Sequence, residues 1–558
     1  MSLRTCLSSA YALSALAFPM AVSAATTAAD SDTHVETLIV TAQKRAENVQ
    51  NVPISIEVVR GEQINDLGVR RFEDLAKYVP NLTVQPTPGA NQIYIRGIGS
   101  GAQNFAFEQD VSLYIDGVYA GRNRQFMSPF FDVERVEVLR GPQGALLGKN
   151  TAAGAISIIS AQPTSVAKAG VDVQTLFGRA GIDASAFVSG PLTEALSGRL
   201  AVKFIRQDGY VHNRYTGQDV PREEDNLVRG ILRYQPSDSF NISAKVEYTD
   251  YTVKGTQAIA IFPGSTDFQR AQKNAQPPFG VPESDHTESW NGVVTANYRA
   301  GDFTLTSLTG YSTYNALKFT AAGSDVPELW LSRQVEKFDQ TSQEVRLLSP
   351  TGRTFEFIVG GYVDESTFKT QFDTLYTIFV AGHTNQLFDQ NTHTWSIFGQ
   401  GVANLGDRFR VLGSLRYSSE RKRATYDAIT ISGIPLNAPR SIAGSRGESN
   451  LDPSVTLQYR PWKHVMLYAT YAQGSKAGGF VSNTGNVTPA TFEFSGEHST
   501  NYEVGLKSTL LRGAALSTSR RSIPSSRTFK SATTSRSSVW LSETPDRRRP
   551  GESKPPSP

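Results

Sequence analysis

The chain has 558 residues, which is too long for one compact core and predicts several domains or one large barrel with an insert. A mean hydropathy of -0.30 excludes a protein of many membrane-spanning helices but not a membrane barrel, whose apolar face takes every second residue. The chain has 55 basic and 52 acidic residues. Ten of the basic residues and three of the acidic ones follow residue 511, which leaves 45 basic and 49 acidic residues up to that point. With no basic face in that part, we expect no nucleic-acid partner.

The N-terminus has the pattern of a secretory signal peptide. Arg4 precedes a mostly apolar run from Leu7 to Val22, and small residues follow up to Ala24. We therefore predict a signal peptide over residues 1–24. A membrane anchor is the alternative, but the apolar run is short and contains Pro19. The only cysteine, Cys6, lies in this segment, so the mature chain is expected to have no disulfide and no thiol site.

Residues 25–44 form a polar linker that contains one apolar strand-like run, from Glu36 to Gln43. Such a run has no sheet of its own in a leader, but it can complete the sheet of another protein by strand addition. An ordinary first strand of the following domain is the alternative.

Residues 45–163 have the pattern of a small α+β domain. A strand is predicted over 52–59, and a helix carries Phe72, Leu75, Ala76 and Val79 before Pro80 ends it. Three strand-like runs with close glycines follow, over 93–97, 111–119 and 133–142. The run from Gly144 to Lys149 fails as a phosphate loop, because Gln143 replaces the first glycine and Asn150 the hydroxyl residue.

From residue 164 to 511 the chain alternates polar and apolar residues in segments of about ten, as in 171–178 and 240–248. Aromatic residues recur near strand ends, as in 459–462, which suits a membrane interface. Short turns are predicted at 236–238 and 300–302, and long connections at 255–289, 370–393 and 424–450. About fourteen strands are predicted between Gly170 and Leu510. A soluble sandwich or propeller is the alternative for this half alone.

Five motifs together resemble the TonB-dependent outer-membrane receptors. They are Leu38–Ala42, which resembles that family's energy-coupling box, then Ile95–Gly97, Tyr114–Tyr119, Glu134–Gly144 and Asn150–Ile159. They stand in the family's order over about a fifth of the chain. Leu147 is a small departure, because the family more often has an aromatic residue at this position. The resemblance implies an all-β transmembrane barrel, here with about fourteen of 22 strands, and a small α+β plug domain at its N-terminus.

By resemblance, the protein is a receptor of the Gram-negative outer membrane that actively imports a scarce ligand. The implied partners are TonB with the inner-membrane energy-transducing complex, outer-membrane lipid and a ferric-siderophore-type ligand. Iron is the commonest cargo of the family; vitamin B12, saccharides and aromatic compounds are alternatives. No cofactor and no catalytic residue is expected, because we find neither an activated nucleophile nor a supported acid pair. A passive porin would lack the plug and the box.

The resemblance also assigns candidate residues. The coupling strand would be Thr37, Leu38, Ile39, Val40, Thr41 and Ala42, and the ligand-facing plug apices Gln103, Asn104, Phe105, Arg122, Asn123 and Arg124. Arg122 and Arg124 would attract an anionic chelate; a solvated turn or contacts with the barrel wall are the alternative. The plug motif residues are Arg96, Gly97, Asp116, Gly117, Glu134, Glu137, Arg140, Gly141 and Pro142, of which the charged members at 96, 134, 137 and 140 are expected to pair with one another or with the wall. His383, His393 and His498 lack metal-ligand spacing, so no metal site is predicted.

The last part of the chain, residues 512–558, is rich in Ser, Arg and Pro, and its alternation stops after Leu511. A natural disordered tail is one explanation. The other is a shifted reading frame, because back-translation from Leu516, read from the third base, can give Leu-Asn-Leu-Ala-Ala-Val-Tyr-Thr-Glu-Phe, which reads as a barrel strand. We therefore predict an out-of-frame tail and a barrel that lacks several strands, with a nonfunctional remnant of a receptor as the alternative to a working transporter.

Overall fold

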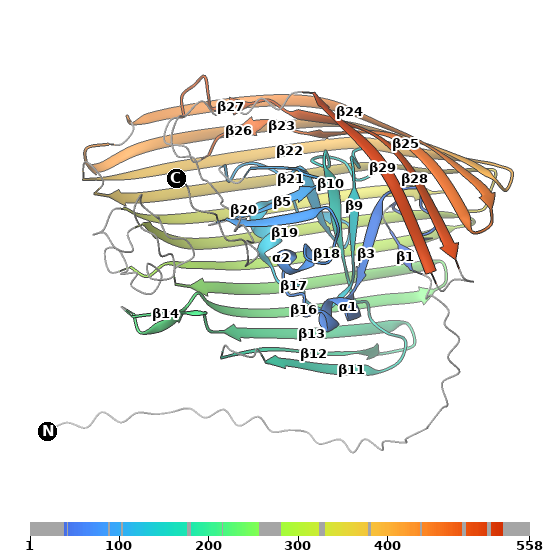
Figure 1. Cartoon of the computed structure of the whole chain (residues 1–558), viewed down its shortest axis with the longest axis horizontal. Helices are drawn as coiled ribbons and strands as arrows, with labels where there is room; N and C mark the ends of the chain where they lie inside the picture. Colours follow the sequence, from blue (N-terminus) through green and yellow to red (C-terminus); the bar gives the residue numbers. More distant parts are fainter. Residues whose placement is uncertain are drawn as a thin grey trace, which may run out of the picture.

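The computed structural model describes residues 38–41, 43–87, 90–101, 104–175, 180–214, 216–255, 281–322, 330–377, 381–435, 438–482, 487–510 and 515–527. The predicted signal peptide, the linker up to residue 37 and the tail after residue 527 lie outside these ranges. The described chain forms a small N-terminal domain on the concave side of one large curved sheet, whose two edge strands are not paired with each other (Figure 1). The resulting architecture is the predicted one, with a mixed domain inside a barrel-like wall.

The N-terminal domain is built on a five-stranded mixed sheet. Its strands, in spatial order, are β3 (Ile56–Arg60), β9 (Val133–Arg140), β10 (Gly154–Ser160), β7 (Val111–Ile115) and β8 (Val118–Tyr119). β10 runs parallel to β7, and the other pairs are antiparallel. A second sheet joins β4 (Leu82–Thr87), β5 (Ala90–Ile95) and β6 (Ile98–Gly99). The helical elements are α1 (Gly61–Asp66), α2 (Phe72–Leu75) and the 3-10 helix η1 (Asn123–Met127).

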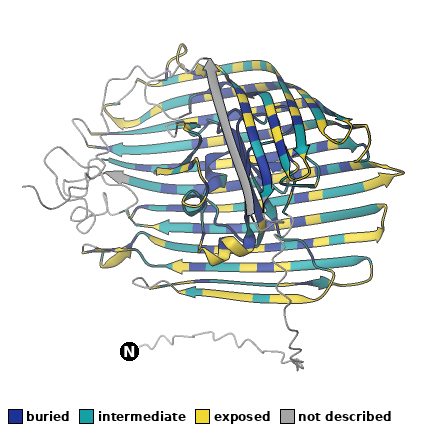
Figure 2. Ribbon diagram, turned by 45° about the vertical axis from the view of Figure 1, so that its right-hand side comes forward, coloured by how far each residue is buried: buried dark blue, intermediate teal, exposed yellow. Residues whose placement is uncertain are grey.

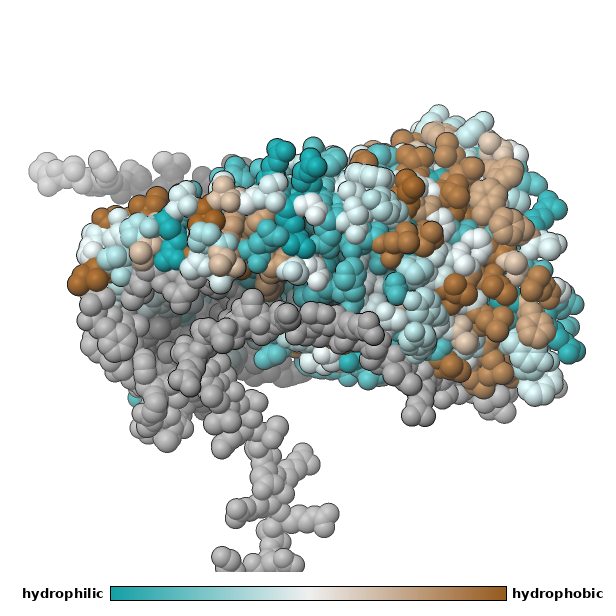
Figure 3. Space-filling view, turned by 90° about the horizontal axis from the view of Figure 1, so that it is seen from above, coloured by the Kyte–Doolittle hydropathy of each residue, from teal (hydrophilic) through white to brown (hydrophobic). Residues whose placement is uncertain are grey.

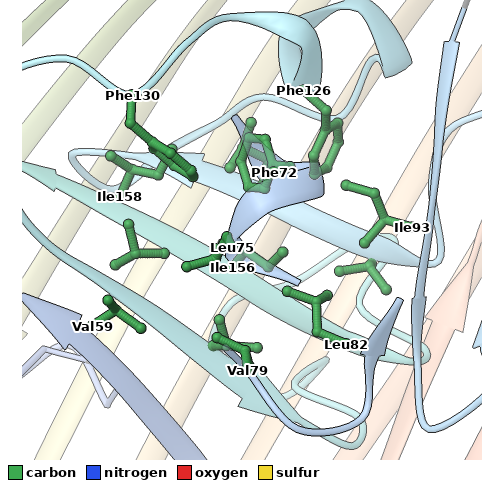
Figure 4. Close-up of a cluster of buried hydrophobic side chains, with 14 of the residues drawn as sticks. Val59, Phe72, Leu75, Val79, Leu82, Ile93, Phe126, Phe130, Ile156 and Ile158 are labelled. Atoms are coloured by element: carbon green, nitrogen blue, oxygen red, sulfur yellow. The ribbon is translucent and has the colours of Figure 1, made fainter. Parts of the chain in front are cut away.

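The core of this domain explains why its short elements stay in place. Phe72 of α2 packs its ring on Phe126 of η1 and on Phe130, at centroid distances of 5.4 and 4.9 Å. Val79, after α2, and Ile156 of β10 close the same cluster (Figure 4). The predicted helix is shorter than its apolar spacing indicated, because α2 ends at Leu75 and a turn carries Val79 into the core.

The wall is a single antiparallel sheet whose strands follow chain order. They are β11 (Lys168–Thr175), β12 (Gly181–Pro191), β13 (Leu196–Gln207), β16 (Arg222–Ser237), β17 (Phe240–Lys254), β18 (Ser284–Ala300), β19 (Phe303–Ala322), β20 (Trp330–Leu348), β21 (Phe355–Tyr376), β22 (Gly382–Leu405), β23 (Phe409–Gly433), β24 (Arg440–Trp462), β25 (Val465–Lys476), β28 (Glu497–Leu510) and β29 (Ala515–Arg527). Two hairpins stand apart from it, β14 (Val211–Asn213) with β15 (Gln218–Val220) and β26 (Gly479–Phe480) with β27 (Glu493–Phe494).

Fourteen of these strands end at or before Leu510, as the sequence predicted. The fifteenth differs from prediction, because β29 pairs with β28 from Ala515 to Arg527, where we expected no strand. Pairing of this kind uses backbone N–H and C=O groups, so it does not need the apolar alternation that the prediction relied on. Pro524 faces Asn501 in this pair, and β29 ends the sheet, where a proline is tolerated.

Wall residues alternate between a buried inward face and an exposed outward face (Figure 2). On β22, Thr392, Thr394 and Ser396 point inward and are almost fully buried, whereas Trp395 and Ile397 point outward. The buried face of the wall is therefore largely polar, which is the arrangement expected of a wet lumen.

Two predicted long connections are instead mostly strand. Residues 370–376 belong to β21 and 382–393 to β22, and residues 424–433 and 440–450 belong to β23 and β24. The prediction was wrong because apolar residues such as Phe388 and Tyr426 lie on the inward face here while the outward residue Thr425 is polar, which reverses the pattern of apolar outward and polar inward residues that marks a wall strand. The short turns at 236–238 and 300–302 were predicted correctly in place, since β16 and β18 end there.

The outward face changes from apolar to polar along one line across neighbouring strands. Val363 of β21 pairs with Trp395 of β22, and one step further from the short turns Glu365 pairs with His393, which pairs in turn with Arg421 of β23. Between this line and the short turns, the outward residues include Val359, Ile397, Leu415 and Val455, all exposed. In the view of Figure 3 apolar residues gather on the right-hand part and hydrophilic residues over the middle. The apolar part of the outward face therefore has the pattern of a lipid-facing band.

Candidate functional site

The N-terminal strand of the described chain is docked on the plug domain rather than free. β1 (Ile39–Val40) pairs antiparallel with β2 (Glu47–Asn48). Val40 is fully buried beside Val52 and Leu139 of the plug, and Leu38 packs partly on the same cluster. Thr37 and Ala42, the ends of the predicted coupling strand, lie outside the described residues.

Thr41 fastens this strand to the plug sheet through one carboxylate. Its backbone N–H donates to Glu137 Oε1 at 2.9 Å, and its hydroxyl lies 3.2 Å from the same oxygen. Arg135 Nε also donates to that oxygen, at 2.8 Å. Glu137, a predicted plug motif residue, is fully buried and joins the strand to β9.

The segment after β1, residues 44–52, is fixed to the wall; we call it the anchor segment. Lys44 Nζ lies 2.7 Å from a carboxylate oxygen of Glu344, and burial lowers the pKa of Lys44 to about 8 despite that neighbour. The other contacts all reach the wall: Arg45 donates to the carbonyls of Ser349 and Phe357, Glu47 pairs with Arg410, Asn51 accepts from Arg460, and Lys507 donates to the carbonyls of Val49 and Val52. Most of these wall groups flank the short turns.

The charged residues of the plug motifs are paired, Arg96 with the wall and the others with plug residues that were not among the predicted partners. Arg96 pairs with Glu503 of β28 at 2.8 Å, and Arg140 with Glu57 at 3.2 Å. Glu134 pairs with Arg135 on its own strand. The structure adds one pair that we did not predict, between Asp116 and Lys245 of β17.

Glycines make the tight turns on which these motif residues stand. Asp116 and Gly117 join β7 to β8 as a two-residue turn with φ of 50° and 86°, which is the left-handed geometry that Asp-Gly adopts well. Arg96 and Gly97 form the same kind of turn after β5, with φ of 55° and 80°. Gly141 has φ of 83°, and the following Pro142 lines a cavity of about 50 Å³ between plug and wall.

The first predicted apex contacts a segment of the wall that folds over the plug. Asn104 donates to the carbonyl of Phe480 at 3.1 Å and accepts from the backbone N–H and hydroxyl of Ser482 at 3.1 and 2.8 Å. The ring of Phe105 lies 5.4 Å from that of Phe372. Gln103 lies outside the described residues.

The second predicted apex contains two arginines with different surroundings. Arg124 is 2% exposed and pairs with Asp285 at 2.7 Å and Glu336 at 2.8 Å, so it makes the wall contacts that were the alternative to ligand binding. Arg122 donates to the carbonyl of Ala106 at 3.0 Å and lies over the rings of Phe338 and Phe368. Asn123 is buried and bonds to Gln109.

A buried group of charges, missed by the sequence analysis, joins the plug to the wall beside these apices. Lys149 lies 3.2 Å from both Asp364 and Glu420, and Lys422 of the wall lies 2.9 Å from Glu108 of the plug. The lysines beside Glu108 hold the pKa of its carboxyl far below the usual range, although burial alone would raise it. Only the inward, period-two placement of charged residues on β21 and β23 could have signalled these partners.

No helix among the described residues is long and apolar enough to cross a membrane. Within the same ranges no cluster of three or more His, Cys, Asp or Glu side chains is arranged to bind a metal ion. His383 and His393 lie on β22, where the side chain of His393 is 57% exposed, and His498 lies on β28.

Two family models match the chain. The TonB-dependent Receptor Plug Domain matches residues 48–155, and the TonB dependent receptor-like beta-barrel matches residues 185–519. The second match alone covers more than half of the chain.

Known relatives agree with these matches. The chain is 25% identical to the pesticin receptor of Yersinia pestis, over 89% of this chain and 71% of that protein. It is 30% identical to an iron-regulated outer membrane virulence protein of Vibrio cholerae, over 40% of this chain and 33% of that one.

Solved structures show the same fold. The ferric yersiniabactin uptake receptor of Yersinia pestis superimposes with a TM-score of 0.70 at 21% identity, over 82% of this chain and 70% of that one. The ferripyoverdine receptor of Pseudomonas aeruginosa superimposes with a TM-score of 0.65 at 17% identity, over 87% and 65%. The chain therefore belongs to the TonB-dependent receptors, outer-membrane proteins in which a plug domain lies inside a β-barrel.

Proposed function

We propose that this receptor actively imports a ferric siderophore, with TonB and the inner-membrane complex as the source of energy. The observation that carries the proposal is a plug held across the lumen, with an N-terminal strand at the end of the barrel where the short turns lie. In outer-membrane barrels the short turns face the periplasm. Two relatives whose structures are similar are named for uptake of ferric yersiniabactin and binding of ferripyoverdine, which supports iron-siderophore cargo.

The proposed coupling strand is Thr37 to Ala42. Strand addition to TonB needs free backbone N–H and C=O groups, and β1 now uses such groups in pairing with β2. Coupling therefore begins when β1 leaves β2 and Thr41 leaves Glu137. A pull on the strand then reaches the anchor segment before it reaches the plug sheet, because residues 44–52 follow directly and are held by the wall.

The plug is suited to being moved because polar contacts hold it in the lumen. Ion pairs such as Lys149 with Glu420 and Arg124 with Asp285 can be exchanged for contacts with water as the lumen opens. A purely apolar interface would lose its whole hydrophobic contribution at that moment. The proposed function requires no covalent chemistry from any residue of the chain.

Transport of radioactive iron tests the proposal. Cells that express the full chain in a strain without other iron receptors are given ferric siderophores of several classes, with and without TonB. We expect uptake of at least one chelate that disappears without TonB and in the Val40→Pro variant, because proline removes a backbone donor from the coupling strand. If a correctly inserted receptor imports no iron chelate but takes up vitamin B12 or a saccharide in the same cells, the siderophore proposal fails.

A further inference from the structure

We propose that the outward face of β21 to β24 binds one phosphorylated glycolipid of the outer leaflet, with its phosphate on Arg421 and Arg423 and an acyl chain in an apolar groove nearer the short turns. The inference concerns the membrane side of the wall, so it holds whichever cargo the lumen takes. Two arginines, a polar hollow and a groove lined by glycines carry it, because all three share the strands β21 to β23.

Arg421 and Arg423 stand on the water side of the apolar band. Both are exposed and point outward from β23. The band ends at Trp395 of β22, which pairs with Ser419, and Arg421 is the next outward residue along β23. This side of the band lies away from the short turns, so it faces the outer leaflet. Lipid phosphates occupy the layer directly outside the hydrocarbon, which is the level of the two arginines.

The two arginines have no carboxylate partner in the part of the chain that the structure describes. The outward carboxylates beside them on β21 and β22 have partners of their own, since Glu365 lies 3.6 Å from His393 and Asp389 lies 2.7 Å from Lys369. Guanidinium groups bind phosphate oxygens through two parallel hydrogen bonds. Two of them on one face of a strand, two residues apart, can therefore hold one phosphate between them.

A polar hollow of about 550 Å³ lies beside the arginines. They form one side of it, and hydroxyl and amide groups of the preceding strands line the rest, on Thr341, Thr367 and Asn391. The carboxylates of Asp339 and Glu365 also line it, where sugar hydroxyls can donate to them. Its size is in the range of sites that hold small organic ligands. Such a lining next to two cations suits a sugar that carries a phosphate.

An apolar groove of about 720 Å³ lies on the same strands within the band. Its apolar side chains include Phe357, Val359, Ile397, Leu415, Tyr417 and Val455. The end nearest the arginines is at Tyr417, which precedes Arg421 by four residues on the same face of β23, or about 13 Å along the strand. A lipid with its phosphate on the arginines therefore brings an acyl chain to the open end of the groove.

Glycines form part of the floor of this groove. Gly399 and Gly401 of β22 and Gly413 of β23 point outward, and Gly401 pairs with Gly413. Glycine weakens a strand, and none of the three has a positive φ that would require it. A Cβ atom added at Gly413 would meet nothing within 4 Å, so no described neighbour fills the space above it. Glycine in a strand interior is expected where another molecule comes close to the backbone.

The arginines decide between the possible occupants of the groove. A membrane helix or a second copy of the receptor would also fill an apolar groove, but neither accounts for two unpaired cations at its water end. An acyl chain fits a narrow glycine floor, and the phosphate of the same lipid accounts for the cations. The rings of Trp395 and Tyr417 lie 5.6 Å apart between the two sites, at the level where such rings contact head groups.

Binding of two probe lipids to the purified full-length receptor tests the inference. The probes are bisphosphorylated lipid A and the same lipid with its phosphates removed, each titrated in detergent micelles and counted by native mass spectrometry. We expect one phosphorylated lipid per receptor, bound about tenfold or more tightly than the dephosphorylated one. An excess of inorganic phosphate should not displace it, because a free ion has no acyl chain for the groove.

Two kinds of variant separate the arginines from the groove. The double substitution Arg421→Gln with Arg423→Gln should remove the preference for the phosphorylated lipid. Gly413→Leu should weaken binding of both lipids about tenfold, which corresponds to about two methylene groups kept out of the groove. Lys369→Gln is the control for charge, because that lysine has a carboxylate partner on the same face. Gly230→Leu is the control for volume, because an added Cβ on this outward glycine of β16 also meets nothing within 4 Å.

Each outcome decides the inference while leaving the proposed function to its own test. The shift of the unheated barrel on gel electrophoresis shows that every variant is folded. Equal binding of the two probes, or a preference that survives the double arginine substitution, would mean that the arginines hold no lipid phosphate. Binding unchanged by Gly413→Leu, or a receptor dimer that this substitution dissociates, would overturn the acyl-chain site. TonB-dependent iron uptake enters none of these measurements.

Discussion

At the scale of single residues, Glu137 joins the coupling strand to the plug. Its carboxylate accepts from the backbone and hydroxyl of Thr41 and from Arg135. Glu137→Gln removes the charge from these bonds and should weaken the docking of β1 by about 1–3 kcal/mol. A spin label at Leu38→Cys should become more mobile. Glu134→Gln, on the same strand but paired only with Arg135, is the control, and equal mobility in both variants would contradict the prediction.

Lys44 predicts how the docking of the anchor segment depends on pH. Burial, with help from Arg346 and Arg416, lowers the pKa of Lys44 from 10.5 to about 8, so the released segment holds its proton more tightly than the docked one. Docking should therefore strengthen as pH rises from about 8 to 10.5 and stay constant below 8. The mobility of a label at the exposed Ala46→Cys measures this, and Lys44→Met should flatten the curve. A response confined to pH 5–7 would show that another group controls docking.

The sequence predicted the types of these residues better than their partners. Arg96 and Arg140 were expected in ion pairs because of the motifs around them, and both are paired. Arg122 and Arg124 belong to the same predicted apex, and nothing in the sequence distinguishes them. In the structure they differ because the wall residues Asp285 and Glu336 pair with Arg124 and not with Arg122. The two partners of Arg124 lie more than 150 residues away in the sequence. A single sequence does not show which wall strand faces which turn of the plug.

At the scale of elements, the long wall strands β21 to β24 extend well beyond their apolar parts. Lys369 and Thr425 lie on the outward face in the polar part, whereas Val359 and Ile397 lie in the apolar part. In intact cells, a membrane-impermeant thiol reagent should label Lys369→Cys and Thr425→Cys but not Val359→Cys or Ile397→Cys. Labelling of all four would mean that the apolar band is not covered by lipid.

These same parts of the strands are where prediction failed. Period-two alternation reports a boundary between two environments, so it detects a strand that has lipid on one side and a wet lumen on the other. At Phe388 and Tyr426 the apolar side chains lie inward, and outward neighbours such as Asp389 and Thr425 are polar, which is the reverse of that pattern, so these strands lacked the signal used to recognise the wall. The plug motifs, by contrast, were placed correctly because turn glycines and their neighbours mark local geometry.

At the scale of the whole molecule, the apolar band sets how the wall sits in the bilayer. Ile397→Arg places a charge in the band, close to the line where Trp395 ends it, and should destabilise the folded barrel. The loss should be smaller than the roughly 2–4 kcal/mol expected for an arginine at the middle of the band. His393→Arg, four residues away on the same face, should be neutral. Urea unfolding in lipid vesicles measures both, and equal stability would place the membrane elsewhere.

The out-of-frame reading of residues 512–558 stays a prediction. β29 adds a strand over 515–527, but backbone pairing does not depend on which frame encodes the side chains. Sequencing the gene through codons 505–558 and onward tests it directly. The prediction holds if the shifted frame continues into further alternating strands, and it fails if the present frame is confirmed without such a continuation.

The length of the wall strands has a consequence for how cargo reaches the mouth. A strand of 24 residues such as β22 is about 80 Å long, or roughly 60 Å tall at the usual tilt, and about 25 Å of that is apolar band. The mouth then stands roughly 35 Å clear of the hydrocarbon and roughly 28 Å clear of the head-group layer, some three Debye lengths at physiological ionic strength. Salt screens the negative head groups over that height, so an anionic chelate meets the receptor without being repelled by the membrane beneath it.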